Sequence, residues 1–231
     1  MGTGLPVTKA VLFDVDGTLI DSDDAHARAW VAALAEGGHP VPFERIRPLI
    51  GQGGDRILPE VAGLSDETEP GKTIAQRRGE IFKERELGGI GPTRGAKALL
   101  EAVRARGARV VVATSAKSAQ LDGLLARGDL NDLVDVATTS DDAGSSKPAP
   151  DIVQSALKKA GLEPADVVFV GDTEWDVKAA HDAGVKAVAL RCGGMDPKTL
   201  AGADAVYEDP AELIEMLDRA PFAFANTARA T

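Results

Sequence analysis

Short runs of apolar residues recur along the chain, and they predict the strands of a buried sheet. The first run, residues 9–13, is followed at once by acidic residues and a glycine, which is typical of a strand buried on both faces. Runs of the same kind predict further strands at residues 108–113, 133–137, 167–170 and 185–190, and a weaker one at 205–207.

Helical periodicity separates these strands in the second half of the chain. Apolar side chains recur every three or four positions over residues 97–106, 151–160 and 175–183, which indicates helices with one buried face. Strands that are apolar throughout and alternate with helices imply a parallel sheet covered on both faces. We therefore predict an α/β fold with a doubly wound parallel sheet.

Residues 22–89 break this alternation, because their periodicity is helical almost throughout. Helices are predicted over residues 24–36, 43–50, 55–61 and 73–87, with glycine pairs or single glycines between them. We predict a small all-helical cap domain at residues 21–89, inserted into an α/β core domain formed by residues 1–20 and 90–231. The tail, residues 221–231, is expected to fray.

The net charge and the composition restrict the classes of partner that we expect for this protein. The formal net charge is −10, which argues against a nucleic-acid partner, because such a partner needs a basic face. No stretch reaches the roughly 18 apolar residues of a membrane span, and the first residues lack a secretory leader pattern. With a single cysteine, Cys192, no intrachain disulfide can form, and we expect a cytoplasmic protein without a membrane partner.

Two acids follow the first predicted strand. Asp14 and Asp16 lie two apart, just before Gly17, at the strand end where parallel-sheet proteins place their ligands. Such a carboxylate pair repels itself unless a cation lies between, and Mg²⁺ is the hard cation that prefers oxygen ligands. Alternatively, aspartates before a glycine are common turn residues.

Three later segments carry polar residues at comparable positions. Thr114 and Ser115 end one predicted strand, Lys147 precedes two closely spaced prolines, and Asp172 and Asp176 follow another strand. Taken singly, the hydroxyls could cap a helix, the lysine could be a solvated charge, and the acids could complement a helix N-terminus. Four strand ends bearing acid pair, hydroxyl, lysine and acid pair in order make coincidence a poor explanation.

The order and the residues of these four segments resemble those of the haloacid dehalogenase-like superfamily. The resemblance is to its branch of phosphatases that have a helical cap after the first strand, near beta-phosphoglucomutase and phosphoglycolate phosphatase. The resemblance implies that Asp14 attacks phosphorus to form an aspartyl phosphate and that Asp16 acts as general acid and base. It implies that Thr114 binds the transferring phosphoryl group and that Lys147 neutralises it and orients Asp14.

The same resemblance implies a Mg²⁺ cofactor. Its ligands would be the carboxylates of Asp14 and Asp172 and the backbone carbonyl of Asp16, with Asp176 supporting the metal directly or through water. Dehalogenases of this superfamily lack the second aspartate of the first segment, so Asp16 favours phosphate chemistry over carbon–halogen cleavage.

Four further residues are candidates for binding the substrate. His26 matches a cap-hinge histidine of the resembling group, or packs in the core beside Trp30. Arg56 could reach the non-reacting end of the substrate, or pair with Glu60 four positions on. Ser115 and Lys117 could contact phosphate, and Lys117 could equally be a surface residue.

We therefore expect a Mg²⁺-dependent phosphatase acting on a small phosphorylated metabolite, a sugar phosphate or a phosphoglycolate-like compound, as a monomer or homodimer. A phosphomutase like beta-phosphoglucomutase is the alternative. Where the mutase has a cationic cap lysine this chain has Ile50, which weakens that alternative. A regulatory protein on a hydrolase scaffold that has lost activity is a third possibility.

Overall fold

A single six-stranded sheet forms the centre of the molecule. The computed structural model describes residues 7–225, and its strands lie in the order β3-β2-β1-β4-β5-β6, every neighbouring pair parallel. Their bounds are β1 Ala10–Phe13, β2 Arg109–Ala113, β3 Val136–Thr138, β4 Val167–Gly171, β5 Lys186–Leu190 and β6 Ala205–Tyr207. The predicted parallel α/β sheet is confirmed.

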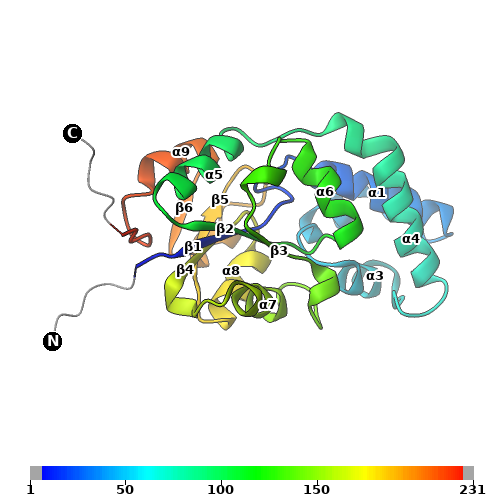
Figure 1. Cartoon of the computed structure of the whole chain (residues 1–231). Coiled ribbons are helices and arrows are strands. Elements are labelled where there is room, and N and C mark those ends of the chain that lie inside the picture. Colours follow the sequence, from blue (N-terminus) through cyan, green and yellow to red (C-terminus); the bar gives the residue numbers. More distant parts are fainter. Residues whose placement is uncertain (1–6, 226–231) are drawn as a thin grey trace.

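Helices cover both faces of this sheet (Figure 1). On one face lie α5 (Ala96–Ala105) and α9 (Pro210–Met216), and on the other α7 (Asp151–Ala160) and α8 (Glu174–Asp182). Because side chains alternate along a strand, Val11 and Phe13 enter the first hydrophobic core while Ala10 and Leu12 enter the second. The strands are apolar throughout because each one contributes side chains to both cores, one on each face of the sheet.

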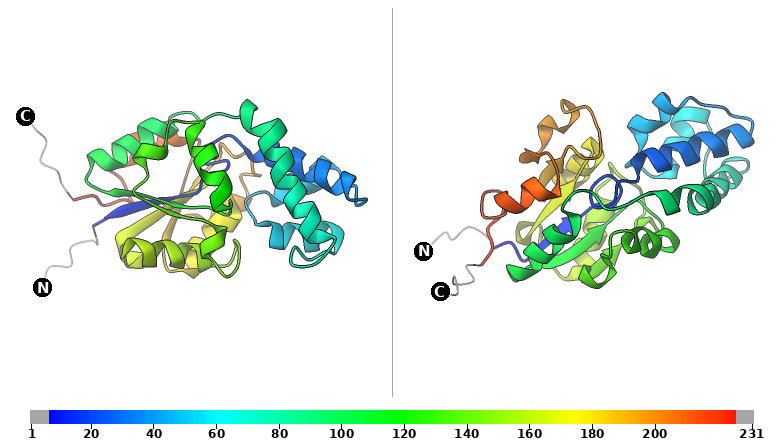
Figure 2. Two further views of the ribbon diagram at one scale, coloured as in Figure 1. Left: turned by 45° about the vertical axis from the view of Figure 1, so that its right-hand side comes forward. Right: turned by 90° about the horizontal axis from the view of Figure 1, so that it is seen from above.

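A group of helices follows β1 and lies beyond one end of the sheet, on the right of Figure 1 and of both views in Figure 2. We call it the helical segment. It comprises α1 (Asp23–Glu36), α2 (Phe43–Ile46), η1 (Arg47–Leu49), α3 (Gly54–Ala62), α4 (Gly71–Ile81), η2 (Phe82–Glu86) and η3 (Leu87–Gly89). These elements occupy the interval in which we predicted a cap, and the exact division at residues 21–89 stays a prediction.

Several elements differ from the sequence-based expectation. The strand predicted at residues 133–137 begins later, because Asn131–Leu133 form a 3₁₀ turn (η4) and the Asp135 side chain accepts a hydrogen bond from the backbone N–H of Val110. Helices α6 (Ser118–Ala126) and α9 were not predicted. Three further 3₁₀ turns lie in the described part of the core, η5 Ser140–Asp142, η6 Pro164–Asp166 and η7 Thr199–Gly202, whereas η2 is a single π-helical turn.

The tail is packed where the structure describes it. Phe222 is buried, and the backbone of Ala223 exchanges hydrogen bonds with Thr8 beside the start of β1. The expectation of a frayed end is therefore wrong for residues 222 and 223, and residues 226–231 lie outside the described part. Between residues 7 and 225, no helix has the length and apolarity that a bilayer crossing requires.

Candidate active site

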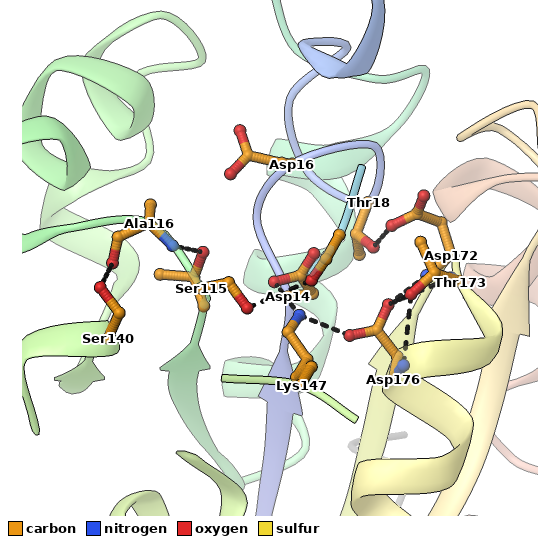
Figure 3. Close-up of polar contacts among 12 residues, drawn as sticks. Asp14, Asp16, Thr18, Ser115, Ala116, Ser140, Lys147, Asp172, Thr173 and Asp176 are labelled. Carbon is orange, nitrogen blue, oxygen red and sulfur yellow. Dashed lines mark hydrogen bonds and ion pairs between the residues drawn. The ribbon is translucent and has the colours of Figure 1, made fainter. Parts of the chain in front are cut away.

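The carboxyl ends of three neighbouring strands bring the predicted site residues together (Figure 3). Asp14 follows β1, Thr114 follows β2 and Asp172 follows β4, and β1 pairs with both of the other strands. Asp14 is 2% exposed, and Thr114 and Asp172 are fully buried. Parallel pairing thus places three residues that are distant in sequence at one edge of the sheet.

Glycine makes the close approach of two segments possible. Gly17 has φ +76°, and a Cβ there would stand 2.3 Å from Oδ2 of Asp172 and 2.5 Å from Oδ2 of Asp23. At Gly193, after β5, a Cβ would stand only 1.8 Å from the same oxygen of Asp172. Both glycines are needed because the Asp172 carboxylate occupies the space that a side chain would take.

Lys147 is fully buried between two carboxylates. Its Nζ lies 2.7 Å from Oδ1 of Asp14 and 2.6 Å from Oδ1 of Asp176. Burial alone would lower the pKa of Lys147, but the two carboxylates outweigh it and raise the pKa above its ordinary value. The lysine therefore stays charged and fixes the orientation of Asp14.

Asp176 holds Lys147 from the first turn of α8. Its Oδ2 accepts hydrogen bonds from the backbone N–H of Thr173 at 3.0 Å and from the hydroxyl of the same residue at 2.6 Å. Thr173 in turn caps the helix, with its hydroxyl accepting from the backbone N–H of Asp176. This reciprocal cap fixes the orientation of the Asp176 side chain, and Asp176 therefore holds the Lys147 ammonium in one position.

The site has the donors and the charge that a divalent cation requires. Single carboxylate oxygens of Asp14, Asp172 and Asp176 lie within 4.8 Å of one another. Oδ2 of Asp172 has no hydrogen-bond partner, and Oδ1 of Asp14 has only its ion pair with the lysine. Burial, reinforced by the neighbouring acids, raises the pKa of both Asp14 and Asp172 well above 3.8. Orphaned hard oxygens with excess negative charge fit Mg²⁺.

Asp16 belongs to a separate hydrogen-bonded group. Its Oδ1 accepts a hydrogen bond from the Ser22 hydroxyl at 2.5 Å and lies 2.8 Å from Nε2 of His26. His26 also stacks on Phe82, with ring centroids 4.0 Å apart. Burial favours the neutral acid, but His26 and Ser22 outweigh it and hold the pKa of Asp16 below its ordinary value.

Of the three remaining candidates for substrate binding, one lies at the cavity and two lie outside it. Ser115 lines the cavity described below, and its hydroxyl donates to the backbone carbonyl of Gly51 in the helical segment. Arg56 and the exposed Lys117 do not line that cavity. Arg56 lies beside Asp55, with 3.8 Å between Nε and the carboxylate, over a separate surface hollow.

A cavity of about 30 Å³ lies between the strand ends and the helical segment. That is room for about two water molecules. The sheet side contributes Asp14, Asp16 and Thr114, and the helical side contributes His26, Trp30, Ile50 and Arg78. This volume is smaller than a phosphorylated metabolite, so the cavity must widen to hold one.

Two residues of the site were not found from the sequence. Asp23 is 2% exposed, neither of its oxygens has a hydrogen-bond partner, and Nη2 of Arg47 lies 3.3 Å away. Burial raises the pKa of Asp23 to about 7 against the opposing charge of Arg47. The other residue, Arg78, is half-buried and lies on the same face of α4 as the buried Ile74 and Ile81. An arginine within an apolar stripe was the signal that could have revealed it.

Comparisons with known proteins agree with this geometry. The family model of haloacid dehalogenase-like hydrolase matches residues 8–184. N-acetylmuramic acid 6-phosphate phosphatase of Pseudomonas aeruginosa is 31% identical over 92% of this chain and 96% of its own. A plasmid-encoded phosphoglycolate phosphatase of Cupriavidus necator is 32% identical over 95% of this chain and 96% of its own. A crystal structure of a hydrolase from Pseudomonas syringae superposes with a TM-score of 0.84 at 31% identity, covering 91% and 98% of the two chains.

Proposed function

The chain belongs to the haloacid dehalogenase-like hydrolases and is a phosphoric monoester hydrolase, and we propose that it hydrolyses a small phosphorylated metabolite through an aspartyl phosphate on Asp14. The observation that carries the proposal is the pair of buried carboxylates, Asp14 and Asp172, with orphaned oxygens beside the fixed ammonium of Lys147. The named activities of the relatives support a sugar phosphate or a phosphoglycolate-like compound as substrate.

Asp14 is the nucleophile in this mechanism. Its carboxylate lies at the floor of the cavity, and the contact with Lys147 limits its rotation. The chief obstacle is repulsion between a carboxylate and an anionic phosphoester, which nearby positive charge removes. Lys147 supplies one such charge, and Thr114 presents a hydroxyl for a phosphoryl oxygen.

Each half of the reaction needs one proton transfer: to the leaving ester oxygen in the first half, and from the attacking water in the second. Asp16 lines the same cavity and is the acid that protonates the leaving alkoxide and then activates water. His26 and Ser22 hold its carboxylate in the present structure, so Asp16 must leave these contacts to reach the substrate. Leaving these contacts removes the interactions that hold the pKa of Asp16 down, so its carboxyl can then carry the proton that the leaving alkoxide takes.

Mg²⁺ is the cofactor in this proposal, with Asp14, Asp172 and the backbone carbonyl of Asp16 as ligands and Asp176 supporting them. When bound, it neutralises charge on the phosphoryl group and aligns the group with the nucleophile. Asp176 contributes mainly by orienting Lys147, since both of its oxygens are already hydrogen bonded.

Water is the proposed acceptor of the phosphoryl group. The cavity position for which the mutase resemblance implies a lysine is occupied by Ile50, which is 3% exposed. An apolar side chain offers no charge for a second phosphate. Supplying a hexose 1-phosphate and finding the 6-phosphate in place of free phosphate would contradict hydrolysis.

The direct test compares the wild type with the Asp14→Asn variant. With Mg²⁺ present, we expect the wild type to release phosphate from a panel of small phosphoesters and the variant to fall to the enzyme-free blank. Rapid quenching of the wild type should yield protein-bound phosphate that hydroxylamine releases, as expected of an acyl phosphate.

Asp24→Asn is the matched control, since Asp24 is a nearby acid whose side chain is 62% exposed. It should retain wild-type turnover. Full turnover by Asp14→Asn would disprove the nucleophile assignment. A wild type inactive on every phosphoester would favour a regulatory protein.

A further inference from the structure

Arg78 is placed as a ligand-binding cation opposite the nucleophile. Its side chain reaches the cavity from α4, and its guanidinium carbon lies 5.1 Å from the centre of the Trp30 ring. Nε is buried and has no hydrogen-bond partner, and Nη1 reaches only Oε1 of Gln120, at 3.5 Å. Burial lowers the pKa of Arg78, with Asp16 opposing this effect weakly. The charge is therefore partly dehydrated and poorly satisfied.

Other arginines of the helical segment show what Arg78 lacks. Arg28 pairs with Glu86, Arg47 with Asp23 and Asp24, and Arg77 with Glu36 and Glu80. Within residues 7–225, no carboxylate lies within ion-pair distance of Arg78. It is also the one lysine or arginine among the described residues that line the cavity. A partly dehydrated guanidinium without an acid partner implies that an anion from outside completes it.

The surroundings select the class of anion. The planar guanidinium presents Nε–H and Nη–H in a fork that matches two oxygens of a carboxylate or of a phosphate. The neighbouring cap side chains Trp30, Ile50 and Ile57 are apolar. Besides Arg78, the polar cap side chains that line the cavity are Gln52 and His26, and His26 contacts Asp16. The cap therefore offers little to the several hydroxyls of a sugar. Arg78 is the single lysine or arginine among the described lining residues, and one guanidinium matches the single negative charge of a carboxylate better than the nearly double charge of a second phosphate.

Building on the proposed phosphatase function, we propose that Arg78 binds a carboxylate at the non-reacting end of the substrate, so that the substrates of this enzyme are short phosphorylated carboxylic acids. Gln120 assists from α6, where its side chain lies against α4 beside Gly79. Arg78 is thereby a specificity-determining residue, and it lies on a different helix from Arg56.

A matched pair of substrates tests this assignment. 2-Phosphoglycolate and 2-hydroxyethyl phosphate share the reacting end and differ in a carboxylate against a hydroxymethyl group. We expect wild-type kcat/KM to favour phosphoglycolate, and Arg78→Gln to reduce that preference by about 10- to 100-fold, the usual range for one charge-assisted buried contact. Arg78→Lys keeps the charge without the fork and should lose part of the preference.

Arg45→Gln is the matched control, because Arg45 is an exposed arginine of the same helical segment that does not line the cavity; the preference of this variant should equal that of the wild type. The preference is a ratio within one preparation, so loss of folded protein cancels. An unchanged ratio in Arg78→Gln overturns the inference, as does a wild type that prefers ethylene glycol bisphosphate or shows no preference. If no compound, p-nitrophenyl phosphate included, releases phosphate, the proposed function itself fails and this inference fails with it.

Discussion

Replacing Asp23 by asparagine should stabilise the metal-free protein. The carboxyl of Asp23 is buried beside that of Asp172, and neither oxygen has a hydrogen-bond partner. Asparagine has nearly the same shape and no charge, and its amide can donate a hydrogen bond to the orphaned Oδ2 of Asp172. The substitution therefore removes a buried charge without leaving a cavity.

The size of the effect follows from the pKa. The fold raises the pKa of Asp23 from 3.8 to about 7, so the stability that this carboxyl contributes is complete below pH 3.8. It is lost as pH rises through 7, because the fold must then bury a carboxylate that the unfolded chain leaves in water. About three pH units at about 1.4 kcal/mol each give about 4 kcal/mol at pH 8. Relaxation and water penetration reduce this to about 2 kcal/mol.

Urea denaturation at a series of pH values measures the effect. A chelator must be present, because a cation bound at Asp172 would relieve the same repulsion. We expect the free energy of unfolding of Asp23→Asn to exceed that of the wild type by about 2 kcal/mol or more at pH 8. The difference should shrink below pH 7 and vanish near pH 4.

Asp24→Asn provides the control, since Asp24 shares the partner Arg47 but its side chain is 62% exposed. The free energy of unfolding of Asp24→Asn, plotted against pH, should run parallel to that of the wild type. Parallel curves for Asp23→Asn, or a lower stability at pH 8, would refute the reasoning.

Two further predictions concern the charges around the nucleophile. Lys147→Met should lower the free energy of unfolding by about 3–5 kcal/mol, because it leaves buried carboxylates without their cation; a loss below about 1 kcal/mol in urea denaturation would contradict this. Millimolar Mg²⁺ should raise the thermal midpoint of the wild type, by an amount equivalent to about 2.7 kcal/mol at one hundred times Kd. Asp172→Asn should respond much less, and equal shifts in the two proteins would exclude Asp172 as a ligand.

Much of the fold and the floor of the site could be predicted because both depend on local patterns. Continuous apolar runs mark buried parallel strands, and parallel strands end at one edge of the sheet, so Asp14, Thr114 and Asp172 had to converge. The short leucine pattern of α6 and the Asp209-Pro210 start of α9 are weaker signals, and both helices were missed.

The roof of the cavity could not be predicted in the same way. Arg56 and Arg78 both lie on helices of the same segment, and only the packing of those helices decides which one faces the strand ends. Asp23 occupies the first turn of α1, where an acid is ordinarily explained by the helix dipole. Its burial against Asp172 depends on Gly17 and Gly193, which lie far apart in the chain.

Gly193 has a consequence for how sequence variation in this protein should be interpreted. The residue has no functional group and lies in the loop after β5, outside the segments that carry the chemistry. A methyl group there would nevertheless overlap the Asp172 carboxylate. A change to alanine would therefore force that carboxylate out of its position in the site. In a saturation-mutagenesis map this position should therefore be as intolerant as a catalytic acid. A harmful variant at Gly193 would thus show that the space beside Asp172 must stay empty, although Gly193 itself has no chemical role.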